Sequence, residues 1–154
     1  MLAVLDRFAG HRGVVQAREL IALADARAES PQEGRTRLRC IDAGFPCPEP
    51  QIWVYDECGR FVARLDMGWD AILKAAEFDG GDAHSTAEQH AHDRVRRSKL
   101  RDCGWGVAVV TGEHVLSRSL VFENGIGELL SLAPRLPRHH PRYGGWDVPG
   151  GRAA

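Results

Sequence analysis

Residues 60–84, RFVARLDMGWDAILKAAEFDGGDAH, predict two short β-strands joined by a tight turn. Polar and apolar residues alternate along the first strand, so Arg64 and Asp66 point to one face of a sheet and the residues between them to the other. The second strand ends in an acidic run that contains Glu77 and Asp79. Acidic side chains from two neighbouring strands are therefore expected close together in this hairpin.

The predicted register places these carboxylates within reach of one another. A turn centred on residues 70–71 pairs Asp66 with Ala75. Glu77 is then the diagonal neighbour of Asp66, within about 7–8 Å. Carboxylates held that close repel unless a cation or a proton lies between them. Asp79 shares the face of Glu77 but precedes a glycine, so it is either a further ligand or a turn residue.

The whole chain has the composition of one soluble globular domain. Its 154 residues are 44% hydrophobic and 27% charged, and they include no run of about 18 apolar residues and no apolar signal-peptide core. We therefore expect a cytoplasmic protein that does not enter a membrane. The four cysteines form no CxxC pair, which favours reduced thiols over disulfides or a zinc site. Three tryptophans are expected in the core or at its edge: Trp53, Trp69 and Trp105.

Positive charge is concentrated locally, although the formal net charge is −1. Residues 94–101, RVRRSKLR, carry five basic side chains and no acidic one, and residues 135–142 carry three more with two histidines. This pattern is typical either of contacts to nucleic-acid phosphates or of a solvated helix face. Arg96 lies off the stripe that the other arginines form on a helix. The candidate nucleic-acid contacts are Arg94, Arg97, Lys99 and Arg101.

The predicted elements follow the order α-α-β-β-β-α-β-α. Helices are expected over residues 1–25, broken at Gly10 and Gly13, and over 30–44, 86–103 and 113–132, and strands over 51–57, 60–69, 71–79 and 105–111. A break at Asn124 and Gly125 is an alternative for the last helix. A meander of three strands followed by a helix and a strand predicts an α/β protein with an α+β mixed sheet.

The helix predicted over residues 30–44 has signals at both ends. Ser30 is the N-cap, Pro31 takes the first helical position and Gly44 ends the helix. Glu33 stands at the capping-box position. It therefore either caps the helix or faces the acidic cluster as a further ligand.

Five segments, in this order and spacing, resemble a known family: SPQEGRTRLR, VARLDMGW, KAAEFDGGDAH, HDRVRRSKLRDCGW and VAVVT. They are similar to uncharacterised domains related to the very-short-patch mismatch repair (Vsr) endonuclease, of the PD-(D/E)XK nuclease superfamily. The resemblance covers roughly residues 15–132 and implies a restriction-endonuclease-like core. Many such relatives carry an N-terminal winged-helix module that resembles an abortive-infection (AbiEi-like) antitoxin. Residues 1–25 resemble only the end of its connection, so we expect that module to be absent here.

The resemblance divides the chain and assigns roles to its acidic residues. It implies a helical extension over 1–28, a Vsr-like endonuclease domain over 29–132 and a disordered basic tail over 133–154. It implies Mg²⁺ or Mn²⁺ as cofactor and DNA as partner, with a toxin–antitoxin or defence partner as a further expectation. Asp66 matches the central metal-binding carboxylate. The other matched positions are Glu77 and Glu33 as acidic ligands, His84 beside the scissile phosphate, and Asp93 on the later helix.

Phosphodiester hydrolysis is the chemistry that these residues suit. Hard carboxylate oxygens bind Mg²⁺ and leave room for water and phosphate, and a histidine near its ordinary pKa exchanges protons at neutral pH. The metal set is Asp66 and Glu77 with Asp79 or Glu33, and His84 is the proton carrier. Strand alternation points Lys74 to the opposite face.

The chain departs from the pattern of the superfamily at its basic positions. The usual acid-x-lysine element is here Glu77-Phe78-Asp79, and Gly81 and Gly106 stand where relatives usually carry a basic residue. The sequence therefore predicts a metal-dependent DNA endonuclease or nickase and leaves two alternatives open. One is a catalytically weakened nucleic-acid-binding or toxin–antitoxin-associated module on the same fold. The other is a small interaction domain with an incidental acidic cluster.

Overall fold

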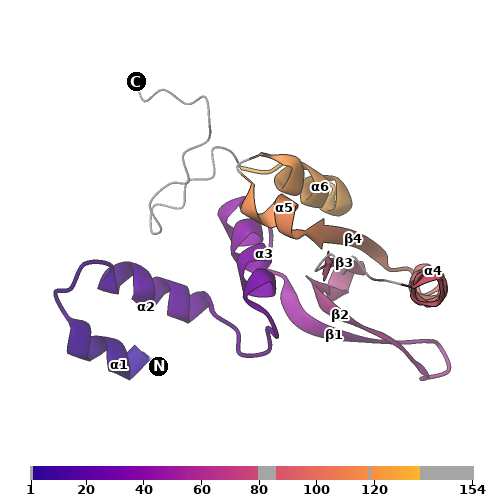
Figure 1. Ribbon diagram of the computed structural model, residues 1–154, viewed down its shortest axis with the longest axis horizontal. Helices are drawn as coiled ribbons and strands as arrows, with labels where there is room; N and C mark the ends of the chain where they lie inside the picture. Colours follow the sequence, from indigo (N-terminus) through magenta and orange to yellow (C-terminus); the bar gives the residue numbers. More distant parts are fainter. Residues whose placement is uncertain (1, 80–85, 118, 136–154) are drawn as a thin grey trace.

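The computed structural model describes residues 2–79, 86–117 and 119–135 (Figure 1). An N-terminal part holds α1 (Leu2–Leu5), η1 (Asp6–Phe8) and α2 (Val14–Leu23). The remaining elements are α3 (Pro31–Asp42), β1 (Glu49–Tyr55), β2 (Phe61–Trp69), η2 (Asp70–Ile72), β3 (Lys74–Asp79), α4 (Ala87–Asp102), β4 (Gly106–Thr111), α5 (Gly112–Leu116) and α6 (Val121–Leu130). This order confirms the predicted mixed α/β class. None of the described helices is long and apolar enough to cross a membrane.

The four strands form one mixed sheet in the order β1-β2-β3-β4. The first three strands are an antiparallel meander, and β4 pairs parallel to β3. Parallel neighbours need a long crossover, which the segment containing α4 provides. The predicted meander followed by a helix and a strand is therefore confirmed, and it brings residues about 30 positions apart in the chain into direct pairing.

The predicted register between β2 and β3 is wrong by two residues. Gly68, not Asp66, pairs with Ala75, and Met67 pairs with Ala76. The connection is longer than a tight turn because η2 is followed by Leu73 in the left-handed region, at φ 51°. The pairing ends at Met67 and Ala76, and continued by one residue this register would set Asp66 opposite Glu77 and not diagonal to it.

Helices pack against the sheet and complete the core. α3, α5 and α6 lie together beside the strands in Figure 1, and α6 contacts β3 and β4 while α4 contacts β2. The predicted end signals of α3 are confirmed, since Ser30 Oγ accepts a hydrogen bond from the Glu33 amide at 3.1 Å and Gly44 has φ 74°. The larger core cluster includes Cys40, Phe45, Met67, Trp69, Val110, Phe122 and Ile126.

A buried ion pair holds α3 against α6. The Arg39 guanidinium donates to both carboxylate oxygens of Glu123, with the shortest contact at 2.7 Å, and Glu123 has no exposed surface. The same guanidinium lies 4.7 Å from the centroid of the Phe122 ring. It also donates to the backbone carbonyls of His114 and Val115 in α5 and of Ser117 and Ser119 in the segment between α5 and α6. One side chain from α3 therefore satisfies both a buried carboxylate and an irregular stretch of backbone.

Two further expectations are corrected here. The helix predicted over 113–132 is two helices, and the break lies before Val121 and not at Asn124 and Gly125, which are inside α6. Ser117 is extended, and the Arg39 contacts satisfy carbonyls that a continuous helix would bond internally. Trp53 is 57% exposed, whereas Trp69 and Trp105 are buried as expected.

Within the described residues, the N-terminal helical segment and the cysteines agree with the predictions. The N-terminal helical stretch is interrupted where expected, at Gly10 and Gly13, both at positive φ. All four cysteines are free thiols. Of the predicted basic tail, residues 136–154 lie outside the described residues, as does His84.

Candidate functional site

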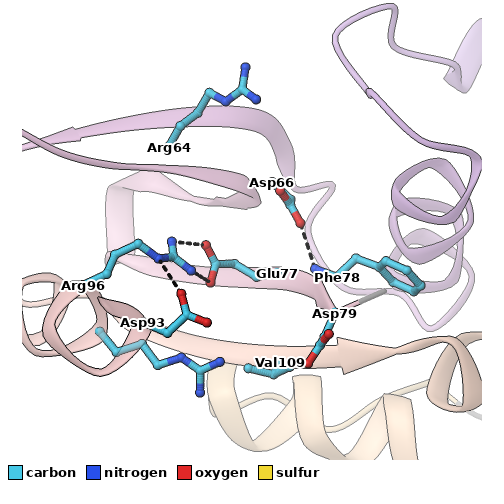
Figure 2. A pocket seen from close by; sticks show the side chains of 9 residues that line it. Arg64, Asp66, Glu77, Phe78, Asp79, Asp93, Arg96 and Val109 are labelled. Carbon is cyan, nitrogen blue, oxygen red and sulfur yellow. Dashed lines mark hydrogen bonds and ion pairs between the residues drawn. The ribbon is translucent and has the colours of Figure 1, made fainter. Parts of the chain in front are cut away.

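A polar pocket of about 310 Å³ lies where β2, β3 and β4 face α4 (Figure 2). The strands contribute Arg64, Asp66, Glu77, Phe78, Asp79 and Val109, and α4 contributes Asp93, Arg96 and Arg97. Four of these nine side chains are acidic and three are basic. The pocket therefore combines oxygen ligands for a cation with positive groups that suit a phosphate.

Asp66 is held in place by the strand beside it. Its Oδ2 accepts a hydrogen bond from the Phe78 amide at 2.8 Å, just beyond the last paired residues of β2 and β3. Burial raises the pKa of the Asp66 carboxyl, and the negative charges of Glu33 and Glu77 raise it further, against the lowering effect of the Phe78 amide and Arg96. Two carboxylates that the sequence singled out, Glu33 and Glu77, thus affect the ionisation of a third, Asp66.

Replacement of Asp66 by asparagine tests the raised pKa of this carboxyl. Because the pKa of Asp66 is raised above 3.8, the native state holds the proton more tightly than the unfolded chain. The free energy of unfolding of the wild type therefore falls as pH rises through 3.8 and the raised native value. In Asp66→Asn this pH-dependent loss of stability is absent. The free energy of unfolding of the variant minus that of wild type should therefore increase between about pH 3 and about pH 7, as measured from the midpoints of urea unfolding. A difference that stays constant or decreases would contradict the assigned cause.

Glu77 is paired with an arginine of α4. Arg96 donates from its two terminal nitrogens to the two carboxylate oxygens of Glu77, each at 2.7 Å, and its Nε lies 3.9 Å from Asp93 Oδ1. Figure 2 shows the guanidinium between these two carboxylates. The bond to Glu77 raises the pKa of Arg96, and the charges of Glu77, Asp93 and Asp66 add to that effect. This two-point pair is the strongest polar contact of the pocket.

Glu33 is hydrogen-bonded near the start of α3. Its carboxylate accepts from the Glu29 amide at 2.9 Å and from Gln51 Nε2 at 3.2 Å, and the side chain is buried. The capping-box alternative predicted a bond to the Ser30 amide, so the observed bond is shifted one residue earlier. The negative charge of Glu33 contributes to the raised pKa of Asp66, but Glu33 itself does not line the pocket, so both alternatives for it remain predictions.

The remaining predicted residues divide between the pocket and the surface. Asp79 and Arg97 line the pocket. Lys74 does not line it, in agreement with strand alternation, and its Nζ lies instead beside Gly106. Arg94, Lys99 and Arg101 are exposed on α4 and do not line the pocket.

Two pocket arginines were not assigned from the sequence. Arg64 shares its strand face with Asp66, so alternation alone was a sufficient signal for it. Arg96 lies on a different face of α4 from the predicted stripe of arginines, and that face is the one turned toward Glu77. Its position three residues after Asp93, one helical turn away, was the available signal.

The carboxylate oxygens of the pocket suit a hard divalent cation, although both oxygens of Glu77 already accept hydrogen bonds from Arg96. Among the described residues, no group of three or more histidine, cysteine, aspartate or glutamate side chains is arranged to hold a metal ion. The donor chemistry nevertheless fits Mg²⁺ or Mn²⁺, since carboxylate oxygens line the pocket. Gln51 adds an observation: its Oε1 is buried without a hydrogen-bond partner, while its Nε2 donates to Glu33.

Comparison with known proteins gives relatives without a described activity. The chain is 37% identical over 133 residues to an uncharacterised protein from each of two strains of Mycobacterium tuberculosis. The match covers 86% of this chain and 45% of each relative, so the chain spans about half the length of the curated relatives it matches. No known protein family's sequence profile matches the chain, and no solved structure matches it.

Proposed function

We propose that this chain is a metal-dependent DNA endonuclease or nickase that hydrolyses phosphodiester bonds, similar to the Vsr-like members of the PD-(D/E)XK superfamily. The observation that carries the proposal is the pocket lined by four carboxylates and three arginines. Burial and the charges of Glu33 and Glu77 also raise the pKa of Asp66, and a bound cation would lower the cost of ionising that carboxyl. The mixed sheet with its parallel β3–β4 pair supports a restriction-endonuclease-like core for the same proposal.

The residues that would hold Mg²⁺ or Mn²⁺ are Asp66 and Glu77, with Glu33 or Asp79 in support. Gln51 joins them as a source of a neutral oxygen, because its buried Oε1 has no hydrogen-bond partner. When bound, such an ion activates a water molecule and stabilises the charge that develops on the phosphate.

The protein's own groups do the rest of the work in this proposal. The Phe78 amide orients the Asp66 carboxylate. Arg97 lines the pocket and neutralises a phosphate there, and the exposed basic side chains of α4 contact flanking phosphates: Arg94, Lys99 and Arg101. His84 is assigned the proton transfer. The four free thiols support a cytoplasmic location.

A second candidate function is a nucleic-acid-binding or toxin–antitoxin-associated module that does not cleave. The two-point contact between Arg96 and Glu77 favours it, since both oxygens of a proposed ligand are already engaged. The absence of a lysine at Asp79 and of a basic residue at Gly106 favours it as well. DNA binding through α4 would persist in such a module.

One experiment separates the two candidates. Supercoiled plasmid is incubated with the full chain and Mg²⁺ or Mn²⁺, and binding of labelled duplex DNA is followed by fluorescence anisotropy at several salt concentrations. The endonuclease proposal predicts nicked plasmid that is lost on adding a chelator. Salt-dependent binding without nicking supports the second candidate. The logarithm of the association constant should then fall with the logarithm of salt concentration, with a slope of about −0.9 for each phosphate contacted. Neither binding nor nicking would contradict both.

A further inference from the structure

Arg96 lies among the pocket carboxylates and contacts Glu77, which the proposed function assigns to a metal ion. Its guanidinium is bonded at 2.7 Å to each oxygen of Glu77 and lies near Asp93. The negative charge of Asp66 also contributes to the raised pKa of Arg96. Figure 2 shows Arg96 reaching from α4 toward the strand that carries Glu77. This positive group thus neutralises Glu77, one of the residues to which the proposed function assigns the metal.

The ion pair between Arg96 and Glu77 has short hydrogen bonds but is only partly buried. The Arg96 side chain is 28% exposed and that of Glu77 is 12% exposed. A two-point bond between an arginine and a carboxylate leaves few acceptor positions for another cation on that carboxylate. A divalent ion that binds Glu77 must therefore displace at least part of this contact.

We propose that Arg96 and a divalent cation compete for Glu77, so that Arg96 holds the acidic cluster together without metal and lowers its metal affinity. This inference rests on the proposed function, because it assumes that Glu77 is a metal ligand. It adds to that proposal a residue that sets the metal requirement.

The competition is a matter of charge and geometry. Binding of the cation to Glu77 and Asp66 places two positive groups side by side, and their repulsion is unfavourable at short distance. Removing the guanidinium removes both the repulsion and the bond that must be broken. Replacing it with a lysine keeps the charge but removes the planar two-point contact.

The test measures metal affinity directly. Mn²⁺ is titrated calorimetrically into the full-length wild type, Arg96→Met and Arg96→Lys, with Arg97→Met as the matched control from the same helix and pocket. We expect Mn²⁺ to bind Arg96→Met about tenfold more tightly than wild type, because one neighbouring positive charge and its bond to the ligand are lost. Arg96→Lys should show a smaller increase and Arg97→Met a change of less than about twofold. Thermal unfolding without metal verifies that each variant is folded.

The outcomes distinguish this inference from the function on which it rests. Equal or weaker Mn²⁺ binding by folded Arg96→Met, with clear binding by wild type, overturns the competition alone and leaves the metal site standing. An equal increase in Arg97→Met also overturns it, since general charge would then explain the effect. Failure of wild type and of every folded variant to bind Mn²⁺ at millimolar concentration overturns the metal proposal itself.

Discussion

Asp66→Ala is expected to reduce Mg²⁺-dependent plasmid nicking by on the order of a thousandfold or more, which corresponds to several kcal/mol of lost stabilisation of the charged transition state. Asp66 lines the pocket together with Glu77 and Asp79, and burial with the charges of Glu33 and Glu77 raises its pKa. Its carboxylate is also fixed by the Phe78 amide. Asp66→Asn, which can still accept that hydrogen bond, should lose activity to a similar degree, because charge and not position is then the missing property. Initial rates of nicking measure both variants.

The controls separate loss of chemistry from loss of fold. Asp70→Asn changes an exposed acidic residue outside the pocket and should retain the wild-type rate. Asp66→Ala should keep its fold, because it removes a carboxylate whose ionisation is unfavourable in the native state. A folded Asp66→Ala variant that nicks at the wild-type rate would contradict the site assignment.

Arg39→Met is expected to destabilise the protein by about 3–5 kcal/mol, the usual cost of removing one partner from a buried ion pair. The fully buried Glu123 would lose its counter-charge, and carbonyls of α5 and of the segment between α5 and α6 would lose a donor. The melting temperature should fall by roughly 10 °C for a chain of this size. Urea unfolding at neutral pH gives the change in free energy.

The chain contains a matched control for the effect of burial. Arg64 also contacts both oxygens of one carboxylate, that of Glu29, at 2.8 Å, but its side chain is 41% exposed and that of Glu29 is 56% exposed. Arg64→Met should therefore cost less than about 1 kcal/mol. Equal losses in the two variants would show that the Arg39 contacts contribute no more than a surface pair. Adding Glu123→Leu to Arg39→Met should recover part of the loss, since no buried charge is then left unpaired.

Local signals in the sequence were sufficient for much of the fold. The Ser30-Pro31 start of α3 and the glycine after its end depend on neighbouring residues only, and they lie where predicted. Alternation along β2 correctly placed Arg64 and Asp66 on the face opposite to Leu65 and its buried neighbours. These features share one property, namely that they are determined within a few residues of chain.

Features that depend on distant contacts could not be predicted in the same way. The register between β2 and β3 depends on Leu73 taking a left-handed conformation, which is uncommon outside glycine. The break before α6 depends on Arg39, which is about 80 positions away along the chain from the carbonyls it satisfies. Arg96, the partner of Glu77, was missed because the spacing of basic residues along one helix does not reveal which residues lie across the pocket from it.

The position of β1 at the edge of the sheet has a consequence for aggregation. An outer strand presents unpaired backbone groups on which another chain can add a strand. Here Pro50 lacks an N–H, Gln51 is left-handed at φ 58°, and the pairing is irregular between Val54 and Tyr55. Regular edge geometry is therefore confined to residues 52–54, too short a template to extend a sheet, even though Trp53 within it is exposed.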